Sequence, residues 1–103
     1  MKKFHVEVTE KALEDVENIF LYISVDLQAP ENAAGQYDRI VQSIMNLERM
    51  PERYPVIESE PECSRGMRLM PVDNYSVIYF IRESRVIVTN VLYSASDLHE
   101  RLR

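Results

Sequence analysis

The stretch Arg65–Tyr93, which reads RGMRLMPVDNYSVIYFIRESRVIVTNVLY, predicts a three-stranded β-meander. The expected strands, each rich in β-branched or aromatic residues, are Met67–Met70, Tyr75–Ile81 and Val86–Tyr93. Turn-forming residues separate them, first Pro71 with Asp73 and Asn74, then residues 82–85. Because proline has no N–H to donate to a ladder, we expect Pro71 to end the first pairing.

The middle strand is apolar on both of its faces. Tyr75, Val77, Tyr79 and Ile81 alternate with Ser76, Ile78 and Phe80. A strand with one wet face would alternate with polar residues, so we expect both faces to be covered. The chain's own helices can cover one face. The other is covered by a loop or the C-terminus of the chain, or by a partner protein.

The residues before the meander predict one strand and two helices. Lys3–Val8 alternates like an edge strand, and Thr9 is a suitable N-cap for the helix that follows. The first helix has an apolar stripe that extends to Leu27. Pro30 suits the first position of a second helix, which should stop at Met50 before Pro51. Two helices joined by so short a link form an antiparallel hairpin.

These elements predict an α+β fold in which the hairpin covers one sheet face. The apolar helix residues expected to pack on Val77, Tyr79 and Ile81 are Leu13, Val16, Ile19, Phe20, Ile23, Tyr37, Ile40, Val41, Ile44 and Leu47. Residues 51–64 hold three prolines and predict an irregular loop. Asp97 with Glu100 three residues later resembles a capping box, which predicts a short C-terminal helical turn.

Composition narrows the class of protein. The 103 residues are 46% hydrophobic, enough for the core of a single domain spanning residues 1–103. The net charge of −5 argues against a general nucleic-acid binder. One cysteine, Cys63, and two histidines predict no disulfide and no metal site, and two glycines provide no phosphate-binding loop, so no cofactor is expected. The chain has no long apolar run, so we expect a cytoplasmic protein without membrane contact.

The order of elements, together with several short motifs, resembles the RelE/ParE superfamily, the toxin halves of bacterial toxin–antitoxin modules. The motifs are Arg68-Leu69 leading into Pro71–Tyr75, the strand Ser76–Tyr79, and Val91–Tyr93 before a polar tail. The resemblance covers nearly the whole chain. It implies a four-stranded sheet completed by the N-terminal strand, and an acidic, partly disordered antitoxin as partner.

The superfamily contains two kinds of toxin. RelE-like members cut mRNA on the ribosome, which requires cations for the phosphate and groups that move protons. ParE-like members bind and poison DNA gyrase. Against the nuclease pattern this chain keeps Arg68, but it has Ser76, Ser96 and Leu102 where nucleases carry functional groups. The resemblance therefore favours the ParE-like branch. The catalytic candidates for the nuclease alternative are Arg65, Arg68, Asp97 and His99.

Three hypotheses follow: a gyrase-binding toxin, a ribosome-dependent mRNA endonuclease, and a repurposed module without toxicity. For both kinds of toxin an antitoxin is expected to supply acids and apolar groups to one surface of the toxin. The residues expected to form that surface are Arg65, Arg68, Ile78, Phe80 and Arg85. Without its partner, the chain would expose this apolar patch and form homodimers through it. A charge at Phe80 would then weaken antitoxin binding more than folding.

Overall fold

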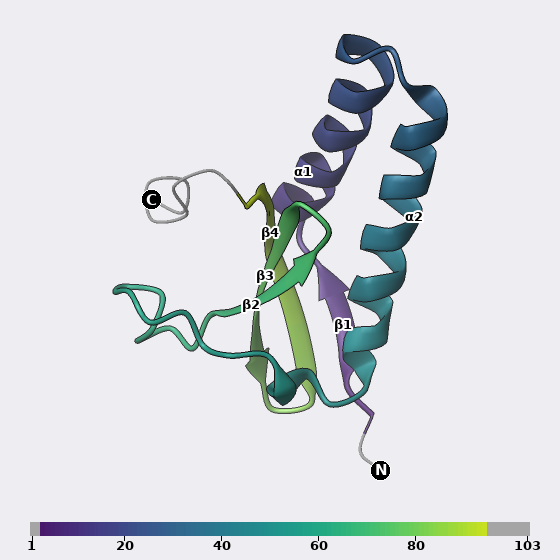
Figure 1. The fold of residues 1–103 in the computed structure, drawn as a ribbon. Helices are drawn as coiled ribbons and strands as arrows, with labels where there is room; N and C mark the ends of the chain where they lie inside the picture. Colours follow the sequence, from purple (N-terminus) through teal and green to yellow (C-terminus); the bar gives the residue numbers. More distant parts are fainter. Residues whose placement is uncertain (1–2, 95–103) are drawn as a thin grey trace.

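The computed structural model describes residues 3–94 and shows a four-stranded sheet with a helical hairpin on one face (Figure 1). The strands are β1 (His5–Val8), β2 (Arg68–Val72), β3 (Tyr75–Arg82) and β4 (Arg85–Tyr93). Their order is β1-β4-β3-β2, with β1 parallel to β4 and the other pairs antiparallel. The predicted α+β fold is confirmed. The predicted C-terminal turn lies outside the described residues.

Both predicted helices are present, but their ends differ from the prediction. The helical segments are α1 (Glu10–Leu21), the π-helical η1 (Tyr22–Asp26), α2 (Pro30–Met45), and the 3₁₀ turns η2 (Asn46–Glu48) and η3 (Pro51–Arg53). Regular α-helix therefore ends at Leu21, not Leu27, and at Met45, not Met50. In η2 the Arg49 N–H bonds the Asn46 carbonyl at 3.2 Å, the tightening that is common where helices end.

Thr9 caps α1 as expected. Its side-chain oxygen accepts a hydrogen bond from the Ala12 N–H at 3.2 Å and donates to the Thr89 carbonyl at 3.4 Å. We predict that Thr9→Ala lowers the free energy of unfolding by about 1 kcal/mol, because the N–H at the helix start loses its acceptor. Thr9→Ser keeps the hydroxyl and should retain most of that stability in urea unfolding. Equal losses in both variants would mean that the methyl group matters instead.

The main core lies between the hairpin and the sheet. Among the helix residues expected there, Val16, Ile40, Ile44 and Leu47 are buried, and Ile19 packs against them. Two expected core residues, Leu13 and Tyr37, are instead 52% and 41% exposed. The buried stripe of α1 is narrower than the stripe predicted from the sequence. It runs through Ala12 and Val16, and Leu13 lies outside it.

Pro71 does not end the first strand, which corrects the prediction. β2 continues to Val72, and Pro71 lies opposite Ser76 of β3. This is possible because β2 is the last strand in the order, so the missing N–H of Pro71 leaves no neighbour unpaired. Asp73 follows with φ of 55°, the left-handed conformation expected at this turn.

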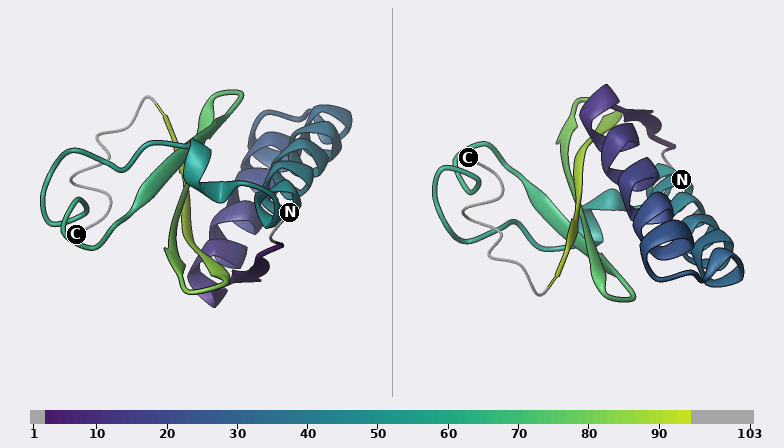
Figure 2. Two further views of the ribbon diagram at one scale, coloured as in Figure 1. Left: turned by 90° about the horizontal axis from the view of Figure 1, so that it is seen from below. Right: turned by 90° about the horizontal axis from the view of Figure 1, so that it is seen from above.

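The second face of the sheet is covered by the chain's own loop, residues 54–67. Figure 2 shows the sheet between the hairpin and this loop. The apolar cluster beneath it consists of the buried residues Met67, Ile78 and Leu92 with the partly buried Ile57, Leu69 and Phe80. The Ile57 N–H bonds the Met67 carbonyl at 2.8 Å, which fixes the loop beside β2. The loop alternative for this face is therefore confirmed.

The start of this loop is anchored by a buried tyrosine. The Tyr79 side chain is fully buried and its hydroxyl donates to the Pro51 carbonyl at 2.6 Å. Arg68, opposite Tyr79 on β2, donates to the carbonyls of Glu52 at 3.0 Å and Tyr54 at 2.5 Å. These bonds hold η3 against the edge of the core.

Burial raises the pKa of Tyr79 to about 12 from an ordinary value of 10.0. A raised folded-state pKa gives stability that is complete below pH 10 and is lost as pH rises toward 12. Between pH 9 and 11.5 the parent chain should therefore lose roughly 2 kcal/mol more than Tyr79→Phe, which cannot ionise there. Urea unfolding at both pH values measures this difference. Parallel losses in the two chains would contradict it.

Candidate functional site

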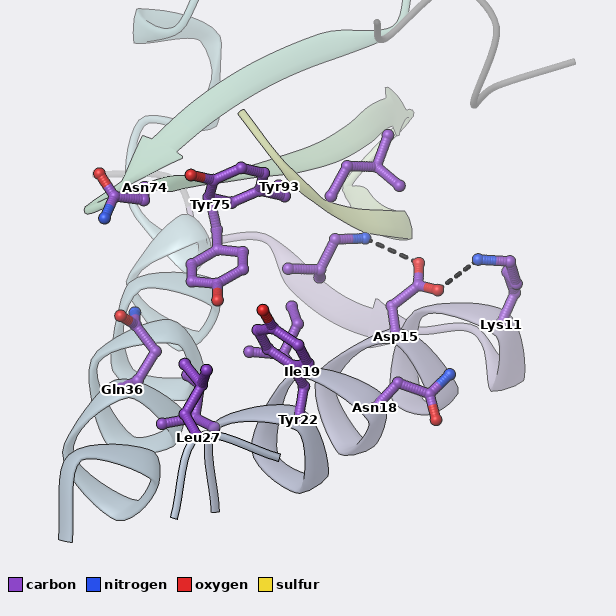
Figure 3. Close-up of a pocket in the computed structure, with 13 residues that line it drawn as sticks. Lys11, Asp15, Asn18, Ile19, Tyr22, Leu27, Gln36, Asn74, Tyr75 and Tyr93 are labelled. Carbon is purple, nitrogen blue, oxygen red and sulfur yellow. Dashed lines mark hydrogen bonds and ion pairs between the residues drawn. The ribbon is translucent and has the colours of Figure 1, made fainter. Parts of the chain in front are cut away.

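A cleft of about 870 Å³ opens between the helical hairpin and the end of the sheet where β3 begins and β4 ends. Figure 3 shows residues from α1, η1, α2 and both strands around it. Its lining residues are Lys11, Asp15, Asn18, Ile19, Tyr22, Ile23, Leu27, Gln36, Asn74, Tyr75, Val91, Leu92 and Tyr93. The cleft is thus aliphatic and aromatic inside, with amides at its rim. Such composition is typical of sites that bind apolar side chains.

Three tyrosines dominate the cleft. The rings of Tyr75 and Tyr93 lie edge-to-face with centroids 5.8 Å apart, and Tyr75 points from the sheet toward Tyr22 of η1 (Figure 3). Burial, with a smaller contribution from Tyr93, raises the pKa of Tyr75. Its hydroxyl is therefore a neutral hydrogen-bonding group at physiological pH. Tyr22 and Tyr93 are each about half exposed, so both rings can contact a ligand.

The charged groups of the cleft neutralise each other. Asp15 accepts a hydrogen bond from the Val91 N–H at 2.9 Å and pairs with Lys11 on the previous turn of α1. Val91 lies just after the β-bulge at Thr89, where the β3–β4 register shifts. Asp15 therefore fixes the irregular part of β4 to α1. The cleft is left without an unpaired charge, which favours apolar ligands over ionic ones.

The rim of the cleft is held by a contact between α2 and the β2–β3 turn. Asp73 accepts hydrogen bonds from Arg39 at 2.6 Å and Gln36 at 3.0 Å. The Arg39 hydrogen bond is the main cause that lowers the pKa of Asp73. Because Asp73 binds two residues of α2, this contact fixes the distance between α2 and the turn. Gln36 also lines the cleft, so the same contact determines the width of the cleft at its rim.

The predicted partner-binding arginines differ in their hydrogen bonding. Arg65 is exposed in the loop, whereas Arg68 binds main-chain carbonyls as described above. Arg85 forms a two-fold hydrogen bond with Glu7 of β1, at 2.5 and 3.0 Å. This pair lowers the pKa of Glu7 and raises that of Arg85. Of the three predicted arginines, Arg65 alone presents a guanidinium without such bonds to residues 3–94.

The apolar residues of the predicted partner surface are less accessible than the sequence suggested. Ile78 was expected on an open sheet face but is fully buried, because the 54–67 loop packs over it. Phe80 is partly buried in the same cluster. A charge at Phe80 would therefore disturb the packing of the loop, and Ile78 is not accessible to a partner while the loop is in place.

The nuclease candidates lie only partly in the described part of the chain. Arg65 and Arg68 lie there, whereas Asp97 and His99 lie outside it. Within residues 3–94 no group of three His, Cys, Asp or Glu side chains could hold a metal ion. Cys63 is exposed and is not part of a disulfide. Among the described helices, none has the length and apolar character needed to cross a membrane.

Sequence reasoning missed the cleft. Tyr75 and Tyr93 read as ordinary cross-strand packing, and Tyr22 lies outside the apolar stripe of its helix. No signal in the sequence distinguishes Tyr22 from the similarly exposed Tyr37, because single exposed apolar residues are common on helices.

A four-stranded sheet with a helical hairpin on one face is the fold of the RelE/ParE superfamily. A family model described as "ParE toxin of type II toxin-antitoxin system, parDE" matches residues 6–98. The chain therefore belongs to the ParE toxin family, and the ParE-like branch favoured by the sequence is confirmed. A comparison with curated proteins found no match.

Solved structures share the fold at low identity. A chain of the chromosomal ParDE toxin–antitoxin system from P. aeruginosa gives a TM-score of 0.74 at 20% identity, covering 90% of this chain and 98% of that one. The RelBE2 complex from Mycobacterium tuberculosis gives 0.64 at 19%, covering 88% and 98%. The archaeal RelE–RelB complex from Pyrococcus horikoshii gives 0.59 at 14%, covering 94% and 100%.

Proposed function

We propose that this type II toxin arrests growth by binding DNA gyrase, and that a cognate antitoxin neutralises it by laying an apolar helix in the cleft. The observation that carries the proposal is the cleft lined by Tyr22, Tyr75 and Tyr93, whose two charged residues, Lys11 and Asp15, pair with each other. Grooves of this kind bind one apolar face of an amphipathic helix. The similar solved structures from M. tuberculosis and P. horikoshii are toxin–antitoxin complexes, which supports an antitoxin partner for this chain too.

The distribution of charge suggests the direction in which the antitoxin chain leaves the cleft. Described residues 63–94 carry four arginines against two acids, whereas the hairpin is strongly acidic. An acidic antitoxin chain would therefore leave the cleft toward the sheet and Arg65, not toward the helices. Contacts with Arg65 would add attraction without requiring Arg68 to give up its carbonyl partners.

Two features favour binding over RNA cleavage. The guanidinium of Arg68, a candidate for holding phosphate, is bound to the carbonyls of Glu52 and Tyr54. The sheet face opposite the hairpin is covered by an apolar loop. A phosphate-binding site needs several converging cations, so these features support a toxin that acts through protein contact.

A supercoiling assay with purified gyrase and relaxed plasmid tests the proposal. The chain should block supercoiling and increase cleaved DNA, and an equimolar amount of antitoxin, encoded by the neighbouring reading frame, should restore activity. If a saturating concentration of the chain changes neither supercoiling nor DNA cleavage, gyrase is not the target. Codon-linked cuts in translated mRNA after induction would select the endonuclease instead. Harmless overexpression in several hosts would support a module without toxicity.

A further inference from the structure

The far end of the helical hairpin carries exposed apolar residues that the cleft does not account for. Figure 1 shows that the hairpin extends past the sheet at the end where α1 and α2 are connected. Leu21, Tyr22, Val25 and Leu27 are each more than half exposed there, at 52–63%. Exposed apolar residues that are clustered in this way usually mark an interaction surface. Of the four, Tyr22 and Leu27 also line the cleft, whereas Leu21 and Val25 do not.

Leu21 and Val25 continue a line of acids along the outside of α1. Glu14, Glu17, Leu21 and Val25 follow at spacings of three and four, so they lie in one row, which we call the outer ridge. All four are exposed, and the buried side of the same helix runs through Ala12 and Val16. The ridge thus presents two carboxylates followed by two apolar side chains.

The charge of the hairpin restricts what can bind the ridge. Residues 10–45 contain seven acids and two bases, a difference of minus five: Glu10, Glu14, Asp15, Glu17, Asp26, Glu31 and Asp38 against Lys11 and Arg39. Both bases are engaged in ion pairs, with Asp15 and Asp73. No ion pair reaches Glu14 or Glu17 from residues 3–94. The ridge therefore repels an acidic antitoxin and attracts a basic surface.

We infer that the outer ridge is the surface with which the toxin binds its target protein, and that it fits an apolar patch flanked by Lys or Arg. This inference rests on the proposed function, in that the chain must act by binding a protein. It also explains neutralisation. An antitoxin helix in the cleft covers Tyr22 and Leu27, which lie next to the ridge at the same end of the hairpin. Antitoxin and target then compete for one end of the molecule.

Two pairs of variants test the ridge against matched controls. Leu21→Ser with Val25→Ser removes its apolar part, and Met45→Ser with Met50→Ser removes two similarly exposed apolar residues at the other end of the hairpin. Glu14→Lys with Glu17→Lys reverses its charge, and Glu52→Lys with Glu83→Lys makes the same change in net charge outside the hairpin. Unfolding curves should stay close to that of the parent in all four, since none of these residues is buried or lines the cleft. All four should still bind antitoxin, and the lysine variants should bind an acidic antitoxin equally well or more tightly.

Growth arrest after induction and association with immobilised gyrase are then measured. Both ridge variants should lose arrest, and the charge variant should associate with gyrase about tenfold more slowly at low salt. Both control variants should behave like the parent. If the parent arrests growth but leaves gyrase unaffected, the gyrase proposal fails while growth arrest still decides the ridge. Ridge variants that fold, bind antitoxin and remain fully toxic would overturn the inference, as would a parent chain that never arrests growth.

Discussion

Replacing Ile44 with Ala should lower the free energy of unfolding by about 2–5 kcal/mol. Ile44 is 4% exposed and packs in the main core between α2 and the sheet. Removing its side chain leaves a cavity that neighbours on the sheet, such as the fully buried Val77 and Tyr79, cannot fill without moving. Small domains have total stabilities of roughly 5–15 kcal/mol, so this is a large loss. Equilibrium urea unfolding measures it.

Two residues that the sequence placed beside Ile44 serve as controls. Leu13→Ala should change stability by less than about 0.5 kcal/mol, because that side chain is 52% exposed. Phe20→Ala should have an intermediate effect. Its ring is partly buried and rests edge-to-face on Tyr37, with centroids 6.0 Å apart, at the outside of the hairpin. A large loss at Leu13, or none at Ile44, would show that the helix faces are assigned wrongly.

Local sequence was sufficient to predict the order of the elements. Turn residues such as Asp73 adopt the left-handed backbone that their side chains tolerate, and Thr9 caps α1 as its hydroxyl allows. These features depend on neighbours within a few residues. The covering of both sheet faces also followed from the five consecutive apolar residues 77–81 of β3.

Features that depend on distant partners could not be predicted. Whether Pro71 ends a strand depends on whether that strand lies at a sheet edge, which only the strand order decides. Likewise Arg68 looked like a cation for phosphate or for an acidic partner. The carbonyls of Glu52 and Tyr54, which it binds, are brought to it by the loop.

The cleft could be predicted even less well from the sequence, because its residues come from separate elements. Tyr22, Gln36 and Tyr93 come from η1, α2 and β4, and no spacing in the sequence relates them. The π-helical η1 begins at Tyr22, where the Leu27 N–H bonds the Tyr22 carbonyl at 3.0 Å. π-Turns inside helices often occur at functional sites, which agrees with the position of Tyr22 at the mouth of the cleft.

The double change Tyr22→Ala with Tyr93→Ala should weaken antitoxin binding at least about a hundredfold, if the antitoxin lies in the cleft. Half-exposed tyrosines in a groove are typical anchors of an interface, and each truncation there costs about 2 kcal/mol or more. Because both rings are about half exposed in the isolated chain, folding should suffer much less than binding. Calorimetric titration with the purified antitoxin gives the affinity, and thermal unfolding of the unbound variant checks the fold.

Tyr37→Ala is the matched control for the single change Tyr22→Ala. Both tyrosines belong to the hairpin and have similar exposure, 41% and 52%, but only Tyr22 lines the cleft. The Tyr37 variant should therefore bind antitoxin like the parent chain, whereas the Tyr22 variant should lose about tenfold or more. Equal losses at the two positions would point to general loosening of the hairpin. Unchanged affinity at both would place the antitoxin elsewhere, and Arg65 with the 54–67 loop would become the next surface to test.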